Sequence, residues 1–259
     1  MNEKVGTKSV TARALAVLDT FDAKHRRQSL AAISRRSNLP LTTVHRLVHE
    51  LEKNDALARG SDGDYEIGSK MWRIGLLASV HADLREVALP YMEDVYEYME
   101  DVYELGNDAV QIAVVDGLRC LVVERIAGSR TMSVMSTPGS RLPLHATGVG
   151  KVLMAFGTHE LQDAVLNSLD RYTDTTITDA KKLRAQLATI KAQGFAKTHE
   201  ELAAGATSIA VPLRGKGGKV IAAMGIVAPS DDSRDISRML PVLQVTAAAL
   251  SKKLVESGY

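Results

Sequence analysis

The chain has 259 residues and is 45% hydrophobic and 24% charged, with a formal net charge of +1, so it is long enough for two globular domains with separate cores. No apolar run is long enough to span a bilayer, and the first residues, MNEKVGTKS, lack the apolar segment of a signal peptide, so we expect a cytoplasmic protein. The single cysteine, Cys120, excludes an intrachain disulfide, and its apolar setting favours a packed side chain over a nucleophile.

Three helices are predicted near the N-terminus. Residues 9–21 form the first, with an apolar side expected to consist of Val10, Leu15, Leu18 and Phe21. Residues 28–54 then read as two helices joined by a tight turn, because Pro40 disfavours helix at the residue before it. In the later helix, four apolar residues recur at i, i+3, i+4 and i+7, namely Val44, Leu47, Val48 and Leu51.

The opposite face of that later helix is polar, and no carboxylate precedes Glu50 on it. We expect Thr42 or Thr43 to cap the helix. The side chains that can donate hydrogen bonds to phosphates and base edges are Thr42, Thr43, His45, Arg46 and His49. Taken alone, this pattern fits an ordinary solvated face as well as a DNA-reading helix, because helix pairs joined by short turns are common.

The flanking sequence favours DNA binding. Residues 57–59 and 65–67 are strand-like and surround a Gly-containing turn, so three helices are followed by a hairpin, as in a winged helix-turn-helix. The first 60 residues hold 11 Lys/Arg and 6 Asp/Glu, a balance of +5, whereas the remainder holds 21 and 25, a balance of −4. Positive charge is therefore concentrated where the helix pair lies, as in nucleic-acid-binding modules.

A connecting helix is predicted over residues 70–82, with an apolar side of Leu76, Leu77 and Val80. A helix is a stiffer connector than a Gly/Ser linker. Pro90 is expected to open the next helix, in which the heptad YMEDVYE occurs twice, at residues 91–97 and 98–104. Seven residues add about two turns with a facing error near 20°, so a tandem duplication keeps one apolar stripe of Met92, Val95, Met99 and Val102. A short coiled-coil seam is the alternative.

The remainder alternates hairpins with separate helices. Strands are predicted at residues 109–115, 119–125, 131–136, 195–199, 208–213 and 220–227. Helices are predicted at residues 148–156, 158–169, 178–193 and about 235–255. This arrangement indicates an α+β domain around an antiparallel sheet.

Two polar clusters lie in this part of the chain. Residues 141–151, RLPLHATGVGK, differ from a phosphate-binding loop at His145 and Val152, but a helix N-terminus after Thr147 can hold a small carboxylate. A capped helix start is the plainer interpretation. Residues 198–208 join His199 to two carboxylates, yet no second histidine stands at ligand spacing. We therefore predict no catalytic residue, no metal site and no cofactor.

These segments together resemble the IclR family of bacterial transcription regulators. The resemblance covers nearly the whole chain, and its most specific parts are RLPLHATGVGKVLMAF and GFAKTHEELAAGATSIAVPLRGKGGKVIAAMGIVAP. It implies a winged helix-turn-helix domain at residues 1–69, a linker helix at 70–82, and a GAF/profilin-like domain at 83–259 for effector binding and oligomerisation. It also implies a homodimer or dimer of dimers that binds double-stranded operator DNA.

The resemblance places DNA contacts on the five polar side chains of the second helix of the pair. It places the effector pocket near Met132, Met135, Ala146, Thr147, Gly148, His199, Ser208, Ala210, Gly225 and Val227. Two features depart from the family: the second heptad, and the lack of a hydroxyl at Gly225 and Val227. We expect a repressor of a catabolic operon controlled by a small organic or aromatic acid. The alternatives are an activator of the same architecture and a metabolic enzyme with a helical dimerisation module.

Overall fold

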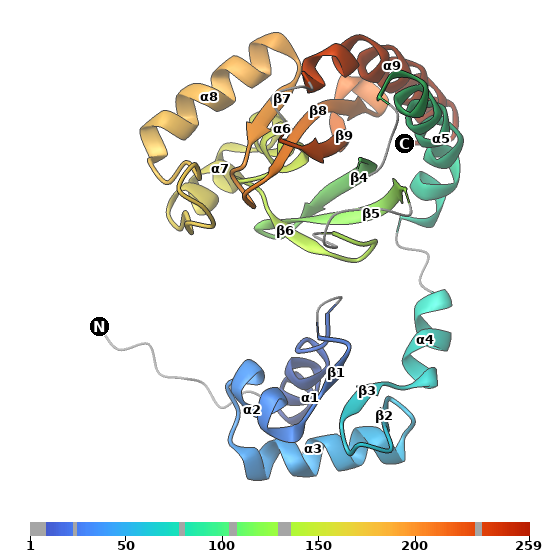
Figure 1. Ribbon diagram of the computed structural model, residues 1–259, viewed down its shortest axis with the longest axis vertical. Helices are drawn as coiled ribbons and strands as arrows, with labels where there is room; N and C mark the ends of the chain where they lie inside the picture. Colours follow the sequence, from blue (N-terminus) through green and yellow to red (C-terminus); the bar gives the residue numbers. More distant parts are fainter. Residues whose placement is uncertain (1–8, 23–24, 78–80, 104–107, 129–135, 231–234) are drawn as a thin grey trace. The chain divides into compact units, whose positions relative to one another are not determined.

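The computed structural model describes residues 9–22, 25–77, 81–103, 108–128, 136–230 and 235–259. The chain divides into two compact units, residues 1–80 and 81–259, which are shown in Figure 1.

Up to Ile67, the smaller unit combines three helices with a three-stranded antiparallel sheet of order β1-β3-β2. Its elements are α1 (Val10–Leu18), β1 (Arg27–Gln28), α2 (Leu30–Ser37), α3 (Leu41–Lys53), β2 (Leu57–Arg59) and β3 (Tyr65–Ile67). The three helices and the hairpin were predicted, whereas β1 was not. Its two residues pair with Tyr65 and Glu66 of β3, a long-range pairing that no local pattern reveals.

The apolar side predicted for α1 is partly wrong. Val10 and Leu15 are more than half exposed, and the buried residue of the helix is Val17. The residues of this region that pack into the core of the unit are Ala14, Val17, Leu18 and Phe21. They follow i, i+3, i+4 and i+7, so the true stripe begins one turn later than the predicted one.

The turn between α2 and α3 fixes where α3 begins. Asn38 ends α2 in the left-handed conformation, with φ +53°, which asparagine tolerates better than most residues. Pro40 is the residue before the first turn of α3, and its side chain makes no cap hydrogen bond. The prediction that Thr42 or Thr43 caps the helix is therefore wrong, because both lie inside it.

The helix predicted at residues 70–82 is observed as the shorter α4 (Ser69–Leu76), and α5 runs from Ala82 to Tyr103. Leu77, expected to be on an apolar side with Leu76 and Val80, is 84% exposed; the other two side chains lie outside the described residues. Pro90 does not open α5 but lies inside it. A proline inside a helix removes one backbone hydrogen bond, and the buried side chains on either side of Pro90 hold the helix together.

The larger unit is built on a six-stranded antiparallel sheet of order β6-β5-β4-β9-β8-β7. The strands are β4 (Ala109–Asp116), β5 (Arg119–Ala127), β6 (Arg141–Pro143), β7 (Ala196–His199), β8 (Ala206–Arg214) and β9 (Val220–Pro229). The helices after α5 are α6 (Gly148–Phe156), α7 (His159–Leu166), α8 (Ala180–Gln193) and α9 (Leu240–Glu256), with short 3-10 turns at Lys216–Gly218 and Ile236–Met239. The predicted α+β architecture is confirmed. Strand β6 was not predicted, and most of the strand predicted at residues 131–136 lies outside the described residues.

Two hydrophobic cores lie on opposite faces of this sheet. In β4, Val110, Ile112 and Val114 pack with α5 and α9. The alternate residue Ala113 packs with α6, α7 and α8, as the two-residue period of a strand requires. Figure 1 shows α5 and α9 on one side of the strands, and α6, α7 and α8 on the other.

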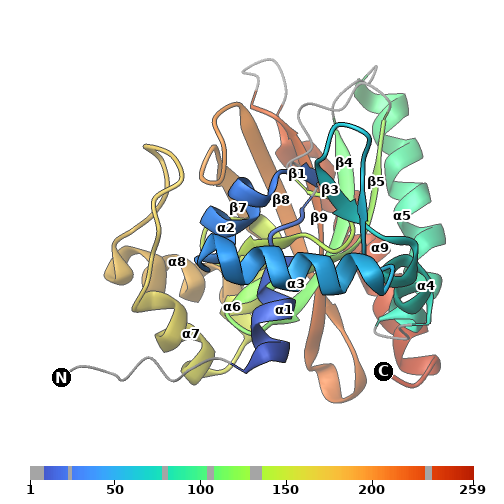
Figure 2. The ribbon, with the colours of Figure 1, turned by 90° about the horizontal axis from the view of Figure 1, so that it is seen from below.

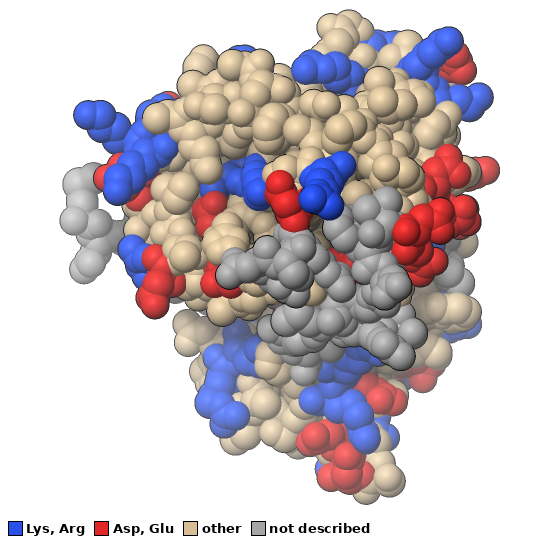
Figure 3. All heavy atoms as spheres, turned by 45° about the horizontal axis from the view of Figure 1, so that its top comes forward, with Lys and Arg blue, Asp and Glu red and all other residues tan. Residues whose placement is uncertain are grey.

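The duplicated heptad lies in α5. Met92, Val95 and Met99 are fully buried against the sheet, so both copies contribute to one stripe, as predicted. The side chain of Val102 lies outside the described residues. The acidic residues of both copies that the structure describes face solvent, and Figure 3 shows acidic side chains gathered on one flank of the molecule.

Candidate functional site

The first candidate surface is the polar face of α3. Figure 2 shows α3 extending across the smaller unit, beside α1 and α2. Its buried face consists of Val44, Leu47 and Val48. Of the five predicted polar side chains, Thr42, His45, Arg46 and His49 are exposed and Thr43 is half-buried.

The charges near α3 divide into paired and unpaired groups. Arg36 pairs with Asp22 at 2.6 Å, and Arg27 pairs with Asp62 at 2.6 Å. Among the described residues, Arg46 has no ion pair, and its guanidinium is available to a phosphate or a base edge. The apolar stripe of α3 thus packs into the core, while the Arg46 guanidinium on the opposite face forms no ion pair with the described residues.

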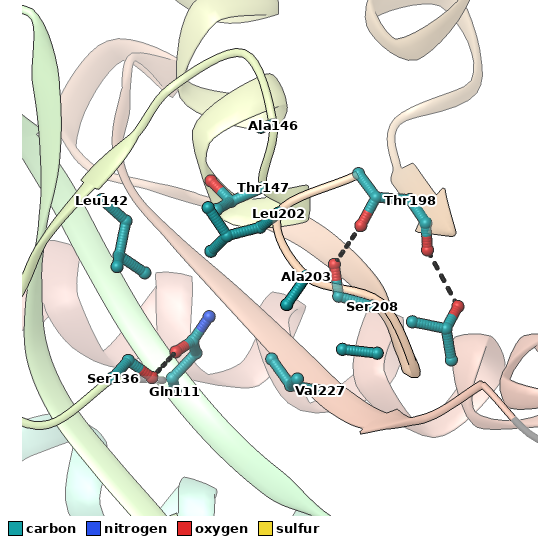
Figure 4. A pocket seen from close by; sticks show the side chains of 12 residues that line it. Gln111, Ser136, Leu142, Ala146, Thr147, Thr198, Leu202, Ala203, Ser208 and Val227 are labelled. Atoms are coloured by element: carbon teal, nitrogen blue, oxygen red, sulfur yellow. Dashed lines mark hydrogen bonds between the residues drawn. The ribbon is translucent and has the colours of Figure 1, made fainter. Parts of the chain in front are cut away.

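The second candidate site is a pocket in the larger unit, at the N-terminus of α6 (Figure 4). It holds about 420 Å³ of space, part of it open solvent. The residues that line it carry apolar, hydroxyl or amide side chains and no charge: Gln111, Ser136, Leu142, Ala146, Thr147, Thr198, Leu202, Ala203, Ala206, Thr207, Ser208 and Val227. A ligand there meets an apolar middle and hydrogen-bonding groups at its ends.

One polar end of the pocket is a chain of hydrogen bonds. The backbone N–H of Gly148 donates to Ser208 Oγ at 3.2 Å, and Ser208 Oγ lies 2.6 Å from Thr198 Oγ1. Ser208 and Thr198 face each other across the β7–β8 ladder. Because one hydroxyl hydrogen suffices to join the two oxygens, the other is left to bind a ligand, beside the positive end of the α6 dipole.

Thr147 holds the start of α6 in place. Its Oγ1 accepts from the N–H of Gly150 at 3.1 Å and donates to the carbonyl of Pro143 at 2.9 Å. The thiol of Cys120 lies 3.7 Å from the same oxygen, and burial raises the pKa of Cys120 to about 11. The buried thiol therefore stays protonated at neutral pH, which fits the prediction of a packed side chain.

The other polar end is formed by Gln111 of β4. Its side chain is 3% exposed, and its Oε1 accepts from the hydroxyl of Ser136 at 3.1 Å. The structure gives the amide nitrogen no hydrogen-bond partner among the residues that it describes. Figure 4 shows that nitrogen turned away from Ser136 and into the pocket.

The structure brings together some of the predicted pocket residues and separates others. Ala146, Thr147, Ser208 and Val227 line the pocket, and Gly148 adjoins it through its hydrogen bond to Ser208. His199 does not belong to it: the side chain is exposed, because it alternates with the inward Thr198 along β7. Met132 and Met135 lie outside the described residues.

Ala210 and Gly225 lie behind the pocket. They face each other in the β8–β9 ladder, and a Cβ added at Gly225 would lie 2.9 Å from the side chain of Val149 and 3.0 Å from Ala210. Since these distances are shorter than ordinary contacts, the glycine serves close packing of α6 on the sheet. The missing hydroxyl at Gly225 therefore does not change the lining of the pocket.

Several lining residues were not predicted. Gln111 had a signal in the sequence, because it is the single polar residue in the apolar run AVQIAVV. Thr198 follows from the period-two alternation once His199 is placed outside. Leu142, Leu202 and Ala203 come from segments without regular pattern and reach the pocket only through the fold.

A buried ion pair supports the loop that covers the pocket. Lys151 of α6 is fully buried, and its Nζ lies 2.5 and 2.7 Å from the two carboxylate oxygens of Glu201 and 2.7 Å from Gln186 Oε1. Burial lowers the pKa of Lys151, and the Glu201 carboxylate opposes that shift. Glu201 directly precedes Leu202 and Ala203, so this pair fixes one wall of the pocket to α6.

The polar cluster at residues 198–201 is thereby accounted for without catalysis. Glu201 binds Lys151, and Glu200 accepts a hydrogen bond from Ser230. In the part of the chain that the structure describes, no group of three or more His, Cys, Asp or Glu is arranged to hold a metal ion. No helix within those same residues has the length and apolar character needed to cross a membrane.

Comparison with known proteins identifies both units. Residues 10–60 match the IclR helix-turn-helix domain, and residues 77–252 match the bacterial transcriptional regulator IclR C-terminal domain. The chain is 28% identical to the HTH-type transcriptional regulator XynR of Escherichia coli, over 93% of this chain and 95% of that protein. It is 30% identical to the Pca regulon regulatory protein of Pseudomonas putida, over 94% and 83%.

Solved structures agree with this result. An IclR homologue from Microbacterium hydrocarbonoxydans, crystallised with 4-hydroxybenzoate, is 33% identical and covers 95% of this chain and 99% of its own, with a TM-score of 0.79. A regulator from Rhodococcus sp. RHA1 is 30% identical over 96% and 99%, with a TM-score of 0.75. The curated relatives are transcriptional regulators, not enzymes. The chain therefore belongs to the IclR family of bacterial transcriptional regulators, with a DNA-binding helix-turn-helix domain and an effector-binding domain.

Proposed function

We propose that the protein represses a catabolic operon and that a small organic or aromatic acid, bound at the N-terminus of α6, controls its affinity for the operator. One observation carries the proposal: a pocket with hydrogen-bonding groups at both ends lies in a chain that also has a DNA-binding unit. A related regulator was crystallised with 4-hydroxybenzoate, a compound with polar groups at both ends of a ring.

The DNA contacts are assigned to the polar face of α3. Its proposed residues are Thr42, Thr43, His45, Arg46 and His49. Arg46 supports the assignment best, because it is exposed and unpaired among the described residues, and a guanidinium can bind guanine or phosphate. The hairpin of β2 and β3 is proposed to contact the adjacent backbone as a wing.

The protein is proposed to bind its operator as a homodimer or dimer of dimers. Three large apolar side chains of the region around α4, those of Trp72, Ile74 and Leu77, are 66%, 52% and 84% exposed. Exposed large apolar side chains of this kind can contribute to an association surface. Two-fold symmetry would match a palindromic operator.

Repression is favoured over activation because a relative, the transcriptional repressor AllR of Escherichia coli, is 29% identical over 84% of this chain and 79% of that protein. The test is to delete the gene and measure transcripts of the neighbouring genes. A rise in those transcripts fits a repressor, and a fall fits the alternative, an activator of the same architecture. A gel shift on the DNA upstream of the gene, repeated at several salt concentrations, tests direct binding, since phosphate contacts make affinity fall steeply with salt.

A further inference from the structure

We propose that Gln111 determines which acids the pocket accepts, by donating a hydrogen bond from its side-chain amide to an oxygen on the end of the ligand far from Ser208. The inference rests on the proposed function, because it names the ligand class of the same pocket. The acid group would lie at the Thr198–Ser208 end, and a second acceptor group at the Gln111 end.

In the structure the amide of Gln111 is turned so that its oxygen faces Ser136. The hydroxyl of Ser136 lies 3.1 Å from Gln111 Oε1 and can donate to it, which occupies the acceptor side of the amide. The NH₂ side is left facing the pocket (Figure 4). That group can only donate, so it selects an oxygen acceptor and disfavours an ammonium.

The burial of Gln111 raises the cost of leaving its amide donor without a hydrogen bond. Gln111 is 3% exposed and stands in a strand whose neighbours Val110 and Ile112 are fully buried on the other face. A buried amide donor without a partner destabilises the protein unless water or a ligand accepts its hydrogen bond. A polar side chain of this kind, held by Ser136 and open to the cavity, is better suited to binding than to packing.

The spacing of the two polar ends limits the length of the ligand. Gln111 lies on β4 and Ser208 on β8, and both strands flank β9, where they pair with Gly225 and Val227. Two strand spacings put the strands about 10 Å apart, and the two-residue offset along β9 adds about 7 Å at right angles, so the two backbones are about 12 Å apart. With a hydrogen bond of about 3 Å at each end, this separation fits a compact acid with an acceptor at the opposite end of a ring or short chain, bordered by Leu142, Leu202 and Val227.

The test uses the full-length protein and two matched pairs of acids: 4-hydroxybenzoate with benzoate, and adipate with hexanoate. In each pair only the first has an oxygen at the far end. Dissociation constants are measured by calorimetry for the wild type and for Gln111→Met, which keeps the length of the side chain and removes the donor. In at least one pair, we expect the wild type to bind the acid with the far oxygen about tenfold more tightly than the acid without it. A factor of this size is the effect of one buried hydrogen bond.

In Gln111→Met that preference should fall to within about twofold, with the affinity for the second member unchanged. A merely structural role would weaken both members of a pair equally. Ser136→Ala, which frees the amide to rotate, should lose part of the preference. Should Gln111→Met fail to fold in a thermal melt, the Ser136→Ala ratio decides in its place.

Two results would overturn the proposal in distinguishable ways. If the acids bind and the ratio of the two dissociation constants in each pair is the same in wild type and variants, Gln111 does not contact the far end of the ligand. The proposed function then stands. If none of the four acids binds a protein that still shifts its operator, the acid effector of the proposed function fails together with this inference.

Discussion

The two polar surfaces of this regulator differ in how their side chains are satisfied. On α3, Arg46, His45 and His49 project into solvent, and their side chains form no hydrogen bond or ion pair with the residues that the structure describes. In the pocket, Thr198 and Ser208 bind each other and the start of α6, and all are buried. A surface of the first kind can be altered without unfolding the protein, whereas alteration of the second changes stability and binding together.

The largest effect is expected at the ion pair behind the pocket, because both of its charges are buried. Lys151→Met should destabilise the larger unit by about 3–5 kcal/mol, because it leaves the Glu201 carboxylate buried and unpaired. Urea unfolding measures the change, with Lys252→Met on the exposed face of α9 as the matched control. The double variant Lys151→Met/Glu201→Leu should recover part of the loss; equal stability of wild type and Lys151→Met would contradict this account of the pocket wall.

A smaller effect is expected for Arg46 on the exposed face of α3, and it should concern operator affinity and not stability. Arg46→Ala should weaken operator binding by about 1–3 kcal/mol if the guanidinium contacts a base, while the free energy of unfolding stays within about 0.5 kcal/mol. Gel shifts and urea melts of the same preparation measure both quantities. Arg238→Ala in the larger unit, whose side chain is also exposed, controls for the loss of one positive charge; an operator affinity of Arg46→Ala equal to that of the wild type would remove Arg46 from the interface.

The smallest effect concerns the buried thiol beside Thr147. Burial raises the pKa of Cys120 from an ordinary value of 9.0 to about 11. Because the folded state favours the protonated thiol, the contribution of Cys120 to the free energy of unfolding is complete below pH 9. That contribution is lost as the pH rises toward 11. At pH 10 the loss is about 1 kcal/mol.

The measurement is the difference in unfolding free energy between wild type and Cys120→Ala at pH 8, 9 and 10, since other groups titrate equally in both proteins. The difference should shrink as the pH rises. A difference that stays constant would mean that the thiol is not as buried as the structure places it.

The same contrast explains what could be predicted from the sequence. The stripe of α3, the hairpin of β2 and β3 and the Thr147 cap depend on residues within a few positions of each other, and their patterns are local. The position of the apolar stripe of α1 was predicted wrongly because packing against the core decides which residues are buried. The start of α5 was predicted wrongly because packing against the core also overrides the helix-breaking signal of Pro90.

The pocket could be predicted only in part, because it is assembled by sheet register. Thr198 rather than His199 points inward once β7 pairs with β8, and Leu142 reaches the pocket through β6, whose three residues give no signal of their own. Gln111 is the exception: a lone polar residue in an apolar strand is visible in the sequence, and it lines the pocket.

The central claim is that the occupied pocket changes the affinity of the smaller unit for DNA. Its most direct test is the operator affinity of the full-length protein with and without a saturating acid from the panel above, together with the affinity of the same acid for free and operator-bound protein. Linkage requires the two ratios to be equal. We predict that the acid weakens operator binding at least fivefold and that the operator weakens acid binding by the same factor; a bound acid that leaves operator affinity unchanged would contradict the account.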